Sequence, residues 1–76
     1  MPKVKHYYIR EWRQVRGLTQ EELSQRAGLR RATVNAVELG KQVMKPETLD
    51  EICHVLKINE KLLKKDPFRK LREVAR

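Results

Sequence analysis

One stretch of the sequence decides the expected fold: Leu18-Thr19-Gln20-Glu21-Glu22-Leu23-Ser24-Gln25-Arg26-Ala27-Gly28. Thr19, with Glu22 three residues later, forms a capping-box pattern, in which each side chain satisfies a free backbone N–H at the start of a helix. Leu23 and Ala27 are one helical turn apart, so they share the face that enters the core. Gly28 suits the left-handed backbone turn that ends a helix. The stretch therefore predicts a short helix closed by a tight turn.

A second helical pattern follows this turn over residues 31–39 and is closed by Gly40. Val34 and Val37 are its inward pair, and Leu29 is expected to fill the corner between the two helices. The opposite side of the helical wheel carries Ala32, Asn35, Ala36 and Leu39. Two short helices joined by a tight glycine turn are typical of a helix-turn-helix, whose second helix lies in the major groove of DNA. The pattern therefore predicts recognition rather than catalysis.

The rest of the chain also carries helical signals, and strand signals are nearly absent, so we expect an all-α fold. Residues 8–16 are expected to form a helix closed by Gly17, with an inward stripe of Ile9, Trp12 and Val15. Pro46 suits the first turn of a later helix. The inward stripe of that helix consists of Leu49, Ile52, Cys53 and Leu56.

A short helix capped by Asn59 is expected next, with Leu62 and Leu63 both returning to the core. We divide the chain into an N-terminal basic extension (residues 1–8), a helix-turn-helix domain (9–66) and a C-terminal amphipathic segment (67–76), which is expected to be a short helical segment. One side of the last segment carries Phe68, Leu71 and Val74. Because of this apolar stripe, the C-terminal part from Leu62 to Val74 is expected to help build a two-fold dimer, and a tail folded back on its own core is the alternative.

Length and charge limit the class of protein. The chain has 76 residues, enough for one small core, and its 18 Lys and Arg against 10 acidic residues give a net charge of +8. Such a balance favours a polyanionic partner. No apolar run approaches the roughly 18 residues of a membrane span, and no signal-peptide pattern is visible, so we expect a cytoplasmic protein without a membrane partner. The single cysteine, Cys53, excludes an internal disulfide and suits a small core position.

Residues that could support catalysis or metal binding do not form a recognisable set. His6 and His54 are not paired with a Cys or acidic ligand set, so neither a metal nor another cofactor is expected. No nucleophile is accompanied by a base and an orienting group. An enzyme is therefore the least favoured class.

The region from Ile9 to Leu63 resembles the lambda-repressor-like DNA-binding domains of the Cro, cI and Xre type. The resemblance implies a compact five-helix bundle that binds double-stranded DNA, usually as a symmetric dimer. The landmarks that match at consistent spacing are Arg13, Gly17-Leu18-Thr19-Gln20, Glu22-Leu23, Gly28, Val34, Glu38, Gly40-Lys41, Pro46 and Leu62-Leu63.

The resemblance also implies roles for individual residues. The positions that face base edges are Arg31, Ala32 and Ala36. The positions that contact the DNA backbone are Gln20, Thr33, Lys41 and Lys45, while Arg30 reaches either a phosphate or an outer base. Arg13 and Glu38 match a pair that links the first helix to the third.

The residue types themselves suit these roles. Arg31 can donate a bidentate pair of hydrogen bonds to guanine, and Ala32 and Ala36 are short enough to let the helix lie deep in the groove. Asn35, on the flank, could read adenine or bind a phosphate. The alternatives are a solvated Arg30–Arg31 charge pair, and alanines that serve only as good helix formers.

Two residues depart from the family pattern. Arg30 stands where a Ser or Thr cap often precedes the recognition helix, which leaves the first N–H groups of that helix to water or a DNA phosphate. Leu39 stands where a polar or basic phosphate contact is common. It could touch a sugar or a thymine methyl, or it could mark a protein contact.

Two functions compete on these observations. The leading hypothesis is a sequence-specific, dimeric transcriptional regulator. The alternative is an antitoxin-like or adapter module that uses the same fold to bind a protein partner, such as a toxin-like protein.

Overall fold

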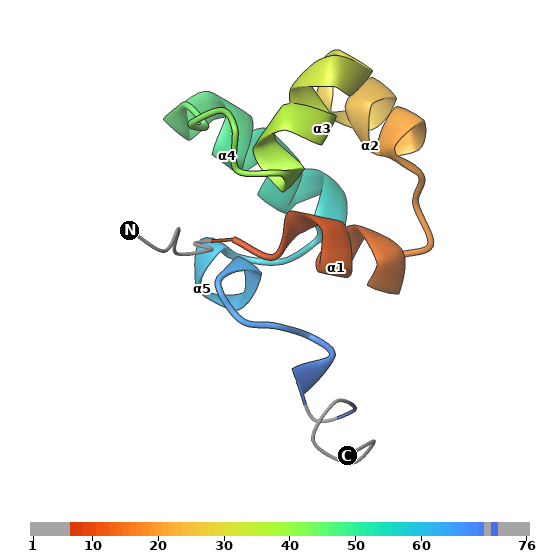
Figure 1. The fold of residues 1–76 in the computed structure, drawn as a ribbon, viewed down its shortest axis with the longest axis vertical. Coiled ribbons are helices and arrows are strands. Elements are labelled where there is room, and N and C mark those ends of the chain that lie inside the picture. The colour runs from red at the N-terminus through yellow and green to blue at the C-terminus, as the bar shows by residue number, and fades with distance from the viewer. Residues whose placement is uncertain (1–6, 70, 72–76) are drawn as a thin grey trace.

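The computed structural model describes residues 7–69 and 71, and this part of the chain contains five helices and no strand (Figure 1). Arg69 and Leu71, beyond these five helices, are also helical. The helices are α1 (Ile9–Val15), α2 (Gln20–Ala27), α3 (Arg31–Glu38), α4 (Pro46–Leu56) and α5 (Glu60–Leu63). The predicted all-α fold is confirmed. Each helix lies within one or two residues of its expected range.

The capping box at the start of α2 is present as expected. The Thr19 hydroxyl accepts the Glu22 N–H at 3.0 Å, and the Glu22 carboxylate accepts the Thr19 N–H at 2.9 Å. These hydrogen bonds to Thr19 hold the pKa of the Glu22 carboxyl below its ordinary value. Gly28 ends the helix with φ +68°, a left-handed conformation that a side chain would strain. The turn into α3 is therefore set by local interactions.

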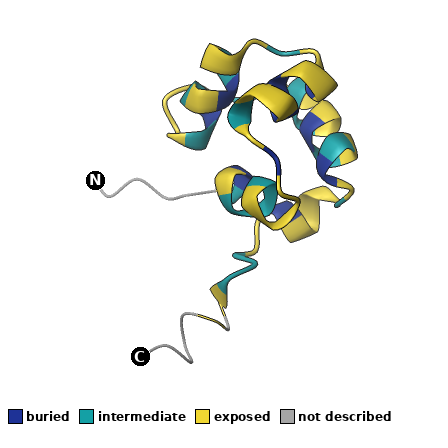
Figure 2. Cartoon of the chain, turned by 90° about the vertical axis from the view of Figure 1, so that its right-hand side faces the viewer, coloured by how far each residue is buried: buried dark blue, intermediate teal, exposed yellow. Residues whose placement is uncertain are grey.

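The core lies between the five helices, and the buried residues gather on their inward sides (Figure 2). Leu29 packs against this core from the corner between α2 and α3, as expected. Cys53 also packs against it, and burial raises the pKa of the thiol, so the group stays protonated at neutral pH. The buried core residues are Ile9, Leu18, Leu23, Ala27, Val34, Val37, Ile52, Leu56 and Leu63.

Two residues expected in the core are instead exposed. Val15 is 44% exposed because positions six apart on a helix lie about 120° apart around its axis, so it turns away from the face that carries Ile9. Leu62 is 40% exposed, whereas Leu63 is fully buried. Neighbouring residues point about 100° apart, and the four-residue α5 buries only one of them. Both inward assignments were wrong.

Helix α1 is joined to the C-terminal ends of α4 and α5 by side chains that bond to backbone carbonyls. The Trp12 indole donates to the carbonyls of Leu62 (3.0 Å) and Lys65 (2.9 Å). One turn later, Arg16 Nε donates to the Leu56 carbonyl at 2.7 Å. The chain leaves α4 through Lys57, which has φ +57°. The bond from Arg16 satisfies a carbonyl that the end of α4 leaves without a partner in the helix.

The C-terminal amphipathic segment is described only in part. Phe68 is half-buried, and its N–H donates to the Asp66 carboxylate at 2.9 Å. Leu71 is 67% exposed, and Val74 lies outside the described residues. No helix within residues 7–69 is long and apolar enough to cross a membrane.

Candidate nucleic-acid interface

The outward face of α3 is open along its length. Val34 and Val37 turn into the core, as expected, and the residues between them face outward or sideways. Arg30 precedes the helix without capping it, since its side chain makes no hydrogen bond to the first N–H groups of α3. The exposed residues are Arg30, Arg31, Ala32, Asn35 and Leu39, and Thr33 and Ala36 are half-buried. The base-facing positions that the sequence predicted are thus accessible, with Ala36 the least so.

A groove of about 600 Å³ runs beside this face, between α3, α1 and the start of α2. Arg31, Asn35 and Leu39, each four residues from the next, form the α3 wall of the groove. Gln20 and Arg10 contribute from the other side. Leu39 therefore lies in line with Arg31 and Asn35, the two donor-rich side chains of α3.

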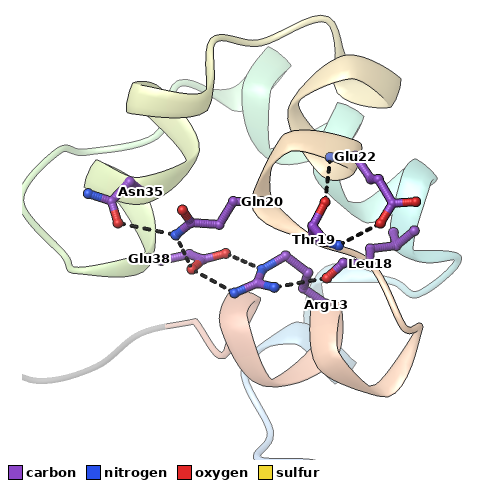
Figure 3. A network of polar contacts seen from close by, with 7 residues as sticks. All are labelled: Arg13, Leu18, Thr19, Gln20, Glu22, Asn35 and Glu38. Carbon is purple, nitrogen blue, oxygen red and sulfur yellow. Dashed lines mark hydrogen bonds and ion pairs between the residues drawn. The ribbon is translucent and has the colours of Figure 1, made fainter.

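Arg13 and Glu38, which both line this groove, form an ion pair (Figure 3). Arg13 Nε donates to Glu38 Oε2 at 2.7 Å, and Nη2 approaches Oε1 at 3.3 Å. Arg13 Nη1 also donates to the Leu18 carbonyl at 2.8 Å. The side chains of Arg13 and Glu38 are only 12% and 2% exposed. Through these contacts, the Arg13 side chain joins α1 to α3 and to the loop that follows α1.

Gln20 is tied into the same cluster, which the sequence did not indicate. Its side-chain Nε2 donates to Glu38 Oε1 at 3.0 Å and to Asn35 Oδ1 at 3.1 Å (Figure 3). Both amide hydrogens are therefore in use in the free protein. The backbone N–H of Gln20, in the first turn of α2, has no partner among the described residues. The only advance signal was that Asn35 and Glu38 are three residues apart and so share one side of α3.

The remaining backbone-contact candidates flank α3 at its two ends. Arg30 precedes the helix, and Lys41 and Lys45 follow it in an exposed loop. The Lys41 N–H donates to the Ala36 carbonyl at 2.8 Å, which fixes where that loop leaves the helix. Thr33 is half-buried on the side of the helix.

The positive charge of the chain is not concentrated in the helix-turn-helix. Residues 9–56 contain eight basic and seven acidic residues, whereas residues 57–76 contain eight basic and only three acidic residues. Exposed cations lie at both ends of α3, while exposed carboxylates lie on α4 at Glu47, Asp50 and Glu51. The field at the α3 face therefore depends on where a few cations lie rather than on the net charge of this region.

No group of three potential metal ligands comes together within the part of the chain that the structure describes. His54 is exposed on α4, and His6 lies outside the described residues.

A family model described as helix-turn-helix matches residues 9–63. Among solved structures, the chain is similar to a hypothetical transcription factor, NHTF, from Neisseria, with 26% sequence identity and a TM-score of 0.74. That similarity covers 95% of this chain and 81% of the Neisseria chain. No match was found among curated proteins. With its five helices, its glycine turn between α2 and α3 and this match over most of its length, the chain belongs to the helix-turn-helix family, in the Cro, cI and Xre type that its sequence resembles.

Proposed function

We propose that the chain is a sequence-specific regulator of transcription that binds double-stranded DNA as a dimer, with α3 in the major groove. The observation that carries the proposal is the open outer face of α3, with cations beyond both of its ends. The name of the Neisseria neighbour, a hypothetical transcription factor, supports the same assignment. A groove-facing helix supplies base contacts, and flanking cations supply phosphate contacts.

Base identity is read chiefly by Arg31 in this proposal. Its fork of donors matches the O6 and N7 acceptors of guanine, and it lies in the first turn of α3. Ala32 and Ala36 let the helix approach closely and touch thymine methyl groups. Leu39 continues the Arg31–Asn35 wall, so it is assigned to a sugar or thymine methyl rather than to a protein partner.

The phosphate contacts are assigned to residues around Arg31. Gln20 contributes its free backbone N–H at the positive end of the α2 dipole, because its side-chain donors are occupied. The side chains assigned to phosphates are those of Arg30, Thr33, Lys41 and Lys45.

Replacing Arg31 and Lys41 separately tests the division of roles. Arg31→Ala should cost about 1–3 kcal/mol on the preferred site and relax base preference at one symmetric position. Lys41→Ala should weaken binding to all sequences alike and lower the salt slope by about one unit. Selection from random DNA defines the site, and titration at several salt concentrations against that site and scrambled DNA gives both quantities. If Arg31→Ala weakens both DNAs equally, Arg31 is a phosphate contact and the assignment is wrong.

The dimer is assigned to the C-terminal amphipathic segment. Leu71 is 67% exposed, and an exposed apolar side chain next to half-buried Phe68 suits a contact with a second copy. Leu71→Asp should therefore raise the dimer dissociation constant at least tenfold, about 1.4 kcal/mol, because a carboxylate would be buried without a partner. Sedimentation equilibrium without DNA measures this constant.

Val43→Asp is the matched control, since Val43 is 91% exposed in the loop after α3. It should leave the dimer unchanged. If Val43→Asp dissociates the dimer and Leu71→Asp does not, the interface lies on the α3–α4 loop instead.

Exposed Val43 also favours the second candidate function, a module that binds a different protein. Mobility shifts with random-sequence and selected DNA at several salt concentrations separate the two functions. Weak binding without sequence preference would favour the protein-interaction module.

A further inference from the structure

The buried ion pair fixes the direction of a chain of hydrogen bonds that ends at the outer face of α3. Glu38, as the partner of Arg13, is a carboxylate that accepts hydrogen bonds and donates none. Whatever lies against Glu38 Oε1 must therefore present an N–H. In this structure that neighbour is the side-chain amide of Gln20, at 3.0 Å.

The orientation of the Gln20 amide follows from this constraint. If its carbonyl oxygen faced Glu38, two acceptors would oppose each other at hydrogen-bond distance, so the NH₂ group must occupy that side. The second hydrogen of the same NH₂ group points to Asn35, whose Oδ1 accepts it at 3.1 Å. Because Glu38 accepts one hydrogen of this NH₂ group, the Asn35 side chain must present its oxygen to the other hydrogen.

Asn35 is left with one kind of group for an external partner. Its oxygen is directed to Gln20, and its nitrogen points away from the cluster (Figure 3). Nδ2 has no partner among the described residues, and Asn35 is exposed between Arg31 and Leu39 on the wall of the groove. Its outward face is therefore a hydrogen-bond donor without an accompanying acceptor.

We propose that Arg13, Glu38 and Gln20 act as a relay that makes Asn35 a donor-only contact to DNA. The inference rests on the proposed function. The groups that fit a lone donor are hydrogen-bond acceptors: guanine O6 or N7, thymine O4, or a phosphate oxygen. Bidentate recognition of adenine, which the sequence left open, needs both a donor and an acceptor from the amide and is excluded while the relay is intact.

The relay is tested first in the free protein, by hydrogen exchange of side-chain amides in NMR spectra. The NH₂ hydrogens of Gln20 should exchange more slowly than those of Asn35, because only the former are bonded within the protein. Gln20→Met should remove the restraint and broaden the range of Asn35 side-chain orientations. Gln25→Met, on the exposed side of α2, is the control and should leave the Asn35 amide signals unchanged. Equal exchange at Gln20 and Asn35 would refute the relay without touching the proposed function.

The second test uses selection of binding sites from random DNA. Asn35→Asp keeps an oxygen toward Gln20 but turns an acceptor outward, so its affinity for the wild-type site should fall about tenfold. If Asn35 faces a base, the wild-type protein selects guanine or thymine there, and the variant shifts toward cytosine or adenine. If Asn35 faces a phosphate, the variant loses affinity equally on all sequences.

If Asn35 faces a base, Gln20→Met should widen the base preference at that position to include adenine. If Asn35 faces a phosphate, Gln20→Met should leave the base preference unaltered. Selection of adenine by the wild-type protein, lost in Asn35→Ala, would overturn the relay. Unchanged affinity of Asn35→Asp would overturn it as well. A protein that binds no DNA would refute the proposed function itself, whatever the amide exchange shows.

Discussion

Replacing Arg13 with alanine should destabilise the protein by about 3–5 kcal/mol, the range for breaking one side of a buried ion pair. The loss is large because the Glu38 side chain, which is 2% exposed, would stay buried without its strongest partner. Gln20 would still donate one hydrogen bond to it, and the Leu18 carbonyl would lose its bond from Arg13. Since small domains are stable by only about 5–15 kcal/mol, this single change should bring the protein near its unfolding threshold.

Urea unfolding at neutral pH measures the change. Arg26→Ala is the control, because Arg26 is exposed on α2, and it should shift the free energy of unfolding by less than about 0.5 kcal/mol. The double variant Arg13→Met/Glu38→Leu should be more stable than Arg13→Ala, because it leaves no uncompensated charge. A loss below about 0.5 kcal/mol in Arg13→Ala would mean that water reaches Glu38 and replaces the pair.

The features that could be predicted from the sequence are those made by residues close together in the chain. The capping box joins Thr19 to Glu22, and Asn59 accepts the Leu62 N–H at 2.8 Å, both across three residues. Gly28 takes its left-handed conformation because of its own missing side chain. Interactions of this kind depend on residue type and spacing alone, so the helix boundaries were largely correct.

The features that could not be predicted join distant segments through groups that carry no sequence signal. Trp12 and Arg16 bond to backbone carbonyls about 40 to 50 residues away, and every residue has such a carbonyl. The Gln20–Asn35 bond depends on how closely α2 approaches α3, which spacing within one helix does not fix. The sequence alone therefore left open whether Asn35 reads adenine or binds a phosphate, because it does not show that the Asn35 oxygen accepts a hydrogen bond from Gln20.

Helix α5 shows what such long-range contacts do for stability. A helix of four residues is too short to persist alone, so tertiary contacts must hold it. Leu63 is fully buried and is its only core residue. The backbone carbonyls of Leu63 and Leu62 accept hydrogen bonds from the Tyr8 N–H (2.8 Å) and the Trp12 indole (3.0 Å). Docking of α5 therefore also holds the start of α1.

Leu63→Ala should destabilise the protein by about 2–5 kcal/mol, whereas its neighbour Leu62→Ala should cost less than about 1 kcal/mol. The first change leaves a cavity in the core under α1 and α4, and the second removes a side chain that is 40% exposed. Both variants keep the backbone carbonyls, so the difference isolates side-chain burial. The fluorescence of Trp12, the only tryptophan, reports whether α5 stays docked during urea unfolding. Equal losses in the two variants would mean that α5 is held by its backbone hydrogen bonds rather than by Leu63.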